Sequence, residues 1–211
     1  MHIEPGILDA VKITGANVAA VAVLGAYVPK LFKTPTLILR TVLAAVFFSL
    51  FMQSFHMPAG ASELHFVGAM PIYLLLGFVP TLFGFAVGLL MQGLLFEPAD
   101  LVHLGVNSLS LMVPLLVLHY SIGQRLAGQF NVKNILKLDA TYYAGVTLMV
   151  GFWLSMGTEA TPFADWALFT SSYVALVLVE PFVTYGIVRL AQLAKDSAWA
   201  RVCFDERVMA A

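Results

Sequence analysis

The first two residues, Met1 and His2, carry the most specific metal-binding chemistry in the sequence. A free terminal amine, the deprotonated backbone amide nitrogen of His2 and an imidazole nitrogen of His2 can occupy three corners of a square around one ion. Tetragonal nitrogen sets of this kind suit Ni(II) and Cu(II), and Co(II) is a further candidate. Reference pKa values of about 7.7–8.0 for the amine and about 6.5 for the imidazole let both groups lose their protons near neutral pH. The pair therefore predicts a site for a divalent transition metal.

Such a site requires Met1 to remain the first residue. The chain opens with an acid and a turn signal, Met1-His2-Ile3-Glu4-Pro5-Gly6, whereas a secretory signal begins with a positively charged stretch before an apolar run. Removal of the initiator methionine normally requires a small second residue, which histidine is not. We therefore expect Met1 to be the mature terminus. A second histidine would complete the square, and the candidates are His65, His56 and His103.

The composition places these residues in a membrane protein. Of the 211 residues, 60% are hydrophobic and only 11% are charged, whereas a soluble domain has about a quarter charged residues. Lipid must therefore be part of the solvent. The net charge of -1 offers no basic field for nucleic acid. No linker or internal repeat divides the chain, so we predict one transmembrane metal-binding bundle over residues 1–192 and a cytoplasmic tail over 193–211.

Apolar runs predict the helices of this bundle. A helix needs about 20 residues to cross a hydrocarbon core of ~30 Å. The candidate runs are 8–29, 36–54, 80–96, 101–121, 138–157 and 166–191. A shorter run, 66–78, predicts a shorter helix that turns back at Pro80. The fold class is thus an all-α membrane bundle of about seven transmembrane helices, and six spans with one re-entrant segment is the alternative.

The basic residues predict the orientation, because Lys and Arg accumulate in cytoplasmic loops. Ten of them fall on one side of the predicted spans: Lys30, Lys33, Arg40, Arg125, Lys133, Lys137, Arg189, Lys195, Arg201 and Arg207. Lys12 is the exception, and Asp9 three residues earlier can pair with it on one helix face. We therefore expect a multi-pass protein of the inner membrane, with its N-terminus outside and its C-terminus in the cytoplasm.

The opposite, outer side collects acids and imidazoles. Its acidic residues are Glu4, Asp9, Glu63, Glu97, Asp100, Glu159 and Asp165, and its histidines are His2, His56, His65 and His103. A face of this kind favours cations over anions.

Two blocks of sequence resemble the cobalt/nickel substrate-binding subunits of energy-coupling-factor transporters, the CbiM/NikM family. The first block is the opening Met1-His2-Ile3-x-x-Gly6. The second runs without gaps through His65-x-x-Gly68, Leu76-Gly77, Gly84-Phe85, Gln92-Gly93-Leu94-Leu95-Phe96 and Leu104-Gly105-Val106-Asn107. Beyond residue 110 only the topology agrees. The residues around His65 and the segment 97–100 depart from the family's usual pattern, so the resemblance leaves the choice between cobalt and nickel open.

The resemblance implies a substrate-capture subunit, or S-component. Such a subunit takes a divalent metal from outside and delivers it through a transmembrane coupling (T) subunit powered by two ATPases. The family's N-terminal segment folds back into the bundle, and the implied ligands here are Met1, His2 and His65. Asn107, Glu63, His56 and His103 are candidates for polar groups that line the pocket. The metal, Co(II) or Ni(II), is the substrate, and no cofactor is expected.

Two further classes of function compete with transport. A phosphate-binding glycine loop followed by Lys and Ser or Thr is absent from the sequence, as are the motifs of Ser-His-Asp hydrolases and of His-Glu-x-x-His metalloproteases. We therefore expect no enzyme activity. An intramembrane metalloenzyme would use Glu63 or Glu97 as a base beside a metal with an open coordination position. A metal-sensing accessory subunit is the other alternative. Glu180, a carboxylate within the last span, is expected to pair with Arg40 or Arg125, or to contact a partner subunit.

Overall fold

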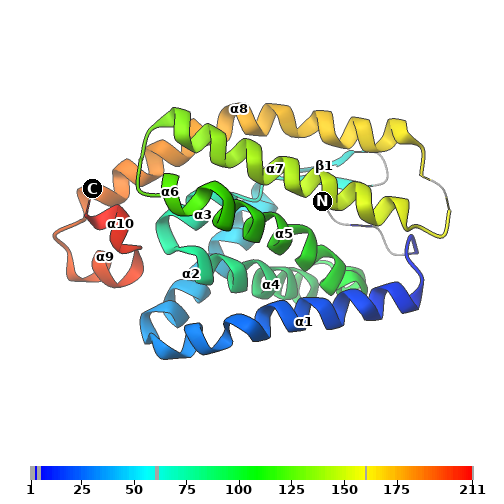
Figure 1. Cartoon of the computed structure of the whole chain (residues 1–211), viewed down its shortest axis with the longest axis horizontal. Helices are drawn as coiled ribbons and strands as arrows, with labels where there is room; N and C mark the ends of the chain where they lie inside the picture. The colour runs from blue at the N-terminus through cyan, green and yellow to red at the C-terminus, as the bar shows by residue number, and fades with distance from the viewer. Residues whose placement is uncertain (1–2, 4–5, 60–61, 160, 211) are drawn as a thin grey trace.

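The chain folds as a bundle of helices that run up and down one long axis (Figure 1). The computed structural model describes residues 3, 6–59, 62–159 and 161–210, with the backbone alone at 56–59 and 62–63. Six long helices form the bundle: α1 (Ala10–Lys33), α2 (Pro35–Ser54), α4 (Phe78–Leu95), α5 (Leu104–Leu118), α7 (Val132–Ser155) and α8 (Phe163–Leu193). The shorter elements are β1 (His56–Ala59), β2 (Ser62–His65), α3 (Ala69–Leu76), η1 (Pro98–His103), η2 (His119–Gly123), α6 (Gln124–Leu126), α9 (Ala198–Cys203) and α10 (Glu206–Met209).

These helices confirm the predicted all-helical membrane bundle. Among the described residues, five helical segments are long and apolar enough to cross a membrane: Ala10–Lys33, Pro35–Ser54, Phe78–Leu95, Pro98–Leu126 and Phe163–Leu193. Helix α7 has 24 residues and is also long enough to cross, but it carries the charged residues Lys133, Lys137 and Asp139. The number of spans and the orientation of the termini stay predictions.

The third predicted span differs most from expectation. Its helix, α3, has only eight residues, about 12 Å of length, and cannot cross a core of ~30 Å alone. The chain turns at Gly77, whose φ of 93° is favourable for glycine, so the predicted turn at Pro80 is wrong. Pro80 lies in the first turn of α4, where a missing N–H costs little. The antiparallel β1–β2 hairpin precedes α3 and aligns His56 with His65.

Glycines let α2 and α4 pack closely. A methyl group on Gly84 would lie 2.4 Å from Cβ of Ala44, and one on Gly88 would lie 2.4 Å from the ring of Phe48. The same interface carries an amide pair, because Gln53 donates to the side chain of Gln92 at 2.7 Å. The family-like glycine spacing on α4 therefore has a packing role.

The C-terminal segment after α8 packs back on the bundle. Arg40 of α2 donates to the carbonyl groups of Val202 at 2.9 Å and Arg201 at 3.3 Å. The N–H of Asp205 donates to the carbonyl oxygen of Leu75 at 2.6 Å. Burial alone would lower the pKa of the Arg207 guanidinium, but hydrogen bonds and attraction from Asp205 outweigh it and raise this pKa. The segment is thus folded against α2 and α3, at the end of the bundle that carries the basic residues.

Candidate metal centre

The segment ahead of α1 enters the bundle at the end opposite the basic residues. Ile3 is fully buried, and its N–H donates to Oδ1 of Asn107 on α5 at 3.0 Å. Further along, the carbonyl oxygen of Ile7 accepts the N–H of Thr158 at 2.9 Å. Ile3 is thus bonded to α5, and Ile7 to the connection between α7 and α8. Met1 and His2, the predicted ligands, lie outside the described residues.

Helix α1 begins just after this segment with a capped end. The Asp9 carboxylate accepts the N–H of Lys12 at 3.0 Å and lies 2.6 Å from the Lys12 ammonium group. The predicted Asp9–Lys12 pair is thereby confirmed. Hydrogen bonds from Lys12 lower the pKa of the Asp9 carboxyl group, so this end of α1 carries a compensated pair rather than a lone cation.

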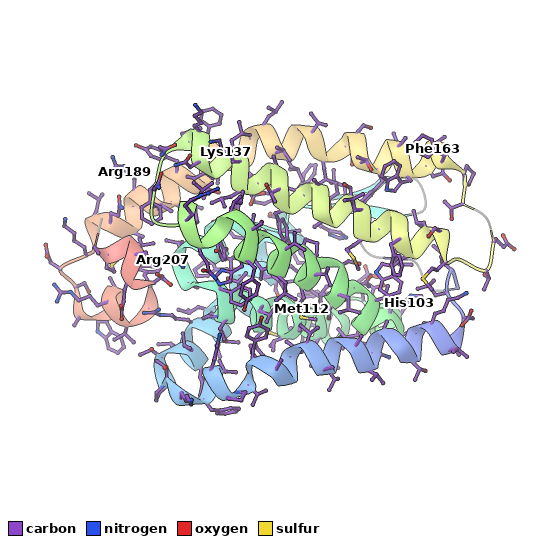
Figure 2. All side chains as sticks on the ribbon, in the orientation of Figure 1. His103, Met112, Lys137, Phe163, Arg189 and Arg207 are labelled. Atoms are coloured by element: carbon purple, nitrogen blue, oxygen red, sulfur yellow. The ribbon has the colours of Figure 1, made fainter. Side chains whose placement is uncertain are left out.

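Of the histidines whose side chains the structure describes, His103 is the most deeply buried. It ends η1, and its exposed fraction is 0%. Among the described residues, neither ring nitrogen has a hydrogen-bond partner. Asn107 follows four residues later, about one helical turn along the same face. Figure 2 shows His103 in the half of the bundle away from Arg189 and Arg207. His103 and Asn107 thus approach the N-terminal segment together.

His65 ends β2 and is also buried, with an exposed fraction of 6%. Three residues later Gly68 adopts a φ of 61°, and a methyl group there would collide with the ring of Phe51 at 2.1 Å. The His65-x-x-Gly68 motif therefore places a buried imidazole just before a turn that tolerates only glycine. His56 is its partner across the hairpin, but the side chains of His56 and Glu63 lie outside the described part of the structure.

The described side chains do not form a metal cage by themselves. Among the described side chains, which do not include those of residues 56–59 and 62–63, no three or more of His, Cys, Asp and Glu are grouped so as to hold a metal ion. A site built on His65 or His103 therefore needs ligands from beyond this set. The terminal amine and the backbone amide predicted at Met1 and His2 are ligands of another kind. The three-residue set stays a prediction.

Two residues that position segments next to the candidate site, Asn17 and Ile3, were not identified from the sequence. The side chain of Asn17 on α1 accepts the N–H of Gly105 at 2.9 Å, and a methyl group on Gly105 would lie 2.3 Å from the same oxygen. This contact locks α1 to the start of α5, two residues before Asn107. A signal for it was present, because Asn17 is an isolated amide in an apolar run.

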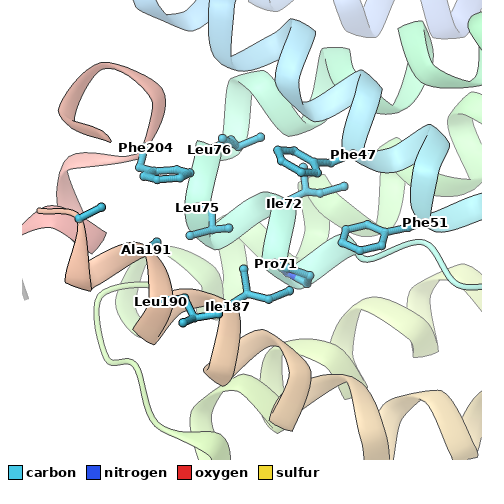
Figure 3. A pocket seen from close by; sticks show the side chains of 11 residues that line it. Phe47, Phe51, Pro71, Ile72, Leu75, Leu76, Ile187, Leu190, Ala191 and Phe204 are labelled. Atoms are coloured by element: carbon cyan, nitrogen blue, oxygen red, sulfur yellow. The ribbon is translucent and has the colours of Figure 1, made fainter. Parts of the chain in front are cut away.

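An apolar groove elsewhere in the molecule can be excluded as the metal site. It encloses about 360 Å³ between α2, α3 and α8 and is closed at one end by Phe204 (Figure 3). Its lining includes Phe47, Ile72 and Leu190, and all eleven lining side chains are apolar. A transition metal would find no ligand there.

Glu180 is not paired as predicted. Its carboxylate accepts the N–H of Met70 at 3.2 Å and the hydroxyl of Tyr143, whereas Arg40 bonds the C-terminal segment. The expected pairing with Arg40 or Arg125 is therefore wrong. The physical reason is that α3 begins beside α8 and presents its free N–H groups to the carboxylate.

Comparisons with known proteins agree with this architecture. The family model described as CbiM, cobalt uptake substrate-specific transmembrane region, matches residues 2–197. A putative metal transport protein of Haemophilus influenzae is 25% identical over 197 residues, which are 90% of this chain and 92% of that protein. The crystal structure of a transition metal transporter superposes with a TM-score of 0.77 at 19% identity, covering 94% of this chain and 96% of the other. At that identity the structural likeness shows the fold.

Proposed function

The chain belongs to the CbiM family of cobalt uptake substrate-specific transmembrane regions, and from this premise we propose that it is the S-component of an energy-coupling-factor transporter for cobalt or nickel. A multi-pass membrane protein with a role in metal uptake is what the family and the apolar helices support. In the proposal the chain binds the ion at the outer face of the inner membrane. It then passes the ion to a coupling (T) subunit driven by two ATPases, and catalyses no reaction itself.

One observation carries the proposed binding mode. Ile3 is buried, and its N–H is held by Asn107. Neighbouring Cα atoms are about 3.8 Å apart, so the nitrogen ligands of His2 belong to the residue next to a buried anchor. We propose the Met1 amine, the amide and imidazole of His2, and His65 as the ligands, with Asn107 fixing the segment and His103 beside it. Substrate Co(II) or Ni(II) would then sit inside the bundle.

Transport fits the structure better than the metalloenzyme alternative. Glu97, one of the two bases considered for catalysis, is exposed at the end of α4, where it cannot activate water in an enclosed site. The ligand set proposed here fills the four corners of a square with protein nitrogens and includes no carboxylate that could act as a base. Stoichiometric binding without turnover would distinguish a transporter subunit from an enzyme.

The decisive experiment lengthens the N-terminus by one residue. Adding a glycine before Met1 retains every side chain but moves the terminal amine by about 3.8 Å and changes the chelate rings around His2. We expect high-affinity binding of Co(II) and Ni(II), measured by calorimetric titration of purified protein, to be lost. The matched control adds one glycine after Ala211 and should bind as the unmodified chain does. Full affinity in the N-terminally extended protein would show that the Met1 amine is not a ligand and would contradict the proposed ligand set.

Substitutions then separate the ligands. His2→Gln removes the imidazole while keeping a large second residue, so Met1 is retained, and binding should fail. His65→Ala should weaken binding but leave the three-nitrogen chelate of Met1 and His2. His56→Ala is expected to matter less than either. Equal losses from all three substitutions would point to a cage of side chains instead.

A transport assay tests the proposed partners. Cells that express this chain together with a coupling subunit and two ATPases should accumulate radioactive cobalt or nickel, because the chain has no nucleotide-binding loop. Cells that express the chain alone should accumulate far less. Equal rates in the two strains would contradict a role that depends on separate ATPases.

A further inference from the structure

Two carboxyl groups are buried within the bundle without a cation. Glu180, near the middle of α8, and Asp139, on α7, both have an exposed fraction of 0%. Glu180 accepts hydrogen bonds from the Met70 N–H at 3.2 Å and from the hydroxyl of Tyr143. In the part of the chain that the structure describes, neither carboxyl group forms a salt bridge. Burying an unpaired carboxylate is costly, and at membrane depth the cost is not relieved by solvent.

Asp139 has the more demanding environment of the two. It lies one helical turn before Tyr143 on α7, and the hydroxyl of Tyr143 donates to Glu180, so both acids adjoin the same tyrosine. Both of its carboxyl oxygens lack a hydrogen-bond partner among the described residues. An ionised carboxylate only accepts hydrogen bonds, so an ionised Asp139 would face a second carboxylate with no donor to stabilise it. Two carboxylates that share one buried site do not both ionise.

The other polar groups that face the pair are hydroxyls. Tyr142 and Tyr143 come from α7, and Tyr173 and Thr184 come from α8, and all four are buried. Helix α5 has no titratable side chain. The only titratable residue of α3, Tyr73, bonds His119 instead, at 2.9 Å. Two further elements pack on α8: β2, which carries His65, and α10, whose Arg207 pairs with Asp205. On α3, α5, α7 and α8 the described groups that face the pair are neutral, and they can donate to a carboxylate or accept from a carboxylic acid.

We propose that Asp139 and Glu180 form a proton-binding site in the interior of the bundle. One proton held by the pair removes the repulsion between two charges and supplies the donor that Asp139 lacks. Among the described side chains, no third acid, histidine or cysteine joins the pair to form a group that could hold a metal ion.

The proton has a structural consequence at the start of α3. Glu180 accepts the Met70 N–H at the N-terminal end of this helix, where a negative charge is favourable. The segment between His65 and Met70 connects this anchor to the proposed ligand. The protonation of the pair and the affinity of the chain for metal are then linked, so that each binding event changes the other by the same factor. This link rests on the proposed function, whereas the proton site does not.

Carbodiimide labelling tests the site on the full chain in liposomes. Dicyclohexylcarbodiimide reacts with protonated carboxyl groups in apolar surroundings. We expect modification of Glu180 or Asp139 at pH 7, mapped by mass spectrometry, and a decline as the pH is raised to 9. Exposed Glu97 and Glu159 are the internal controls and should remain unmodified. Absence of label on both buried residues at pH 6 and pH 7 would overturn the proposal.

Neutral variants give a second readout. Asp139→Asn and Glu180→Gln keep the shape of each side chain, and the Gln carbonyl can still accept the Met70 N–H. Raising the pH from 6 to 9 should lower the melting temperature of the unmodified chain, because the folded pair holds a proton that the unfolded chain has already released, so a rise in pH favours unfolding. The double variant should lose this dependence. Stability that responds to Na⁺ or K⁺ but not to pH would replace the proton by a metal cation and overturn the proposal. Carbodiimide labelling of Asp139 or Glu180 that persists in His2→Gln would show that the proton site does not depend on the metal site.

Discussion

At the residue scale, Asn107 connects the N-terminal segment to the bundle. Its Oδ1 accepts the N–H of buried Ile3, and loss of a buried hydrogen-bond partner costs about 1–3 kcal/mol. Asn107→Leu, which removes the acceptor at similar volume, should therefore weaken Co(II) or Ni(II) binding by about ten- to a hundredfold in calorimetric titration. Asn107→Asp retains an acceptor oxygen and serves as the matched control, with affinity much closer to that of the unmodified chain. Equal affinities in all three proteins would show that Asn107 does not anchor the metal-binding segment.

The sequence predicted part of this neighbourhood. Asn107 was recognised from its place in the Leu104-Gly105-Val106-Asn107 motif, and His65 from the glycine that follows it. The role of Ile3 could not be predicted, because its backbone bonds a residue more than a hundred positions away and its side chain carries no chemistry. Asn17 could be noticed as an isolated amide, but only the packing of α1 on α5 shows what it holds.

At the element scale, the contact between α2 and α4 depends on residues without side chains. Gly84→Ala would place a methyl group 2.4 Å from Cβ of Ala44, and overpacking of this kind typically costs about 1–3 kcal/mol. We expect a fall of about 3–10 °C in the melting temperature of the detergent-solubilised protein. Gly25→Ala on α1 is the matched control, because nothing lies within 4 Å of the added methyl group. It should be neutral or slightly stabilising. Similar melting temperatures in both variants would contradict close packing at Gly84.

Five of the six long helices were predicted to within about four residues, because each contains an apolar run that a bilayer requires. Helix α7 begins at Val132, six residues before the predicted 138, because its first turns carry Lys133 and Lys137. The region 56–78 was predicted less well. The run 66–78 was expected to form one short helix, but α3 covers only Ala69–Leu76, and the strands at His56–Ala59 and Ser62–His65 were not expected. Four-residue strands leave almost no periodic signal. The turn was assigned to Pro80 because proline interrupts helices, whereas Gly77, with its positive φ, makes the turn and Pro80 begins the next helix.

At the scale of the whole molecule, charge divides the bundle along its length. Lys30 and Lys33 end α1, Lys133 and Lys137 begin α7, and Arg189 lies near the end of α8. Figure 1 shows these helix ends together with α9 and α10 at one end, and Figure 2 shows His103 and Phe163 at the other. Because basic residues accumulate on the cytoplasmic side, this arrangement predicts that the candidate metal centre opens outward. Metal would then enter from the side opposite the ATPases.

Cysteine labelling tests this orientation, because the chain has a single cysteine, Cys203, which is partly exposed on α9 at the basic end. The outer envelope of the cells is first removed while the inner membrane stays intact. A membrane-impermeant maleimide should then leave Cys203 unmodified, and should modify it once the inner membrane is permeabilised. The matched variant combines Cys203→Ser with Glu159→Cys, which moves the only thiol to an exposed position between α7 and α8 at the opposite end. That thiol should react in intact cells at the same reagent concentration. Modification of Cys203 in intact cells, together with protection of the introduced cysteine, would reverse the orientation. The metal centre would then face the cytoplasm, which is incompatible with capture of metal from outside.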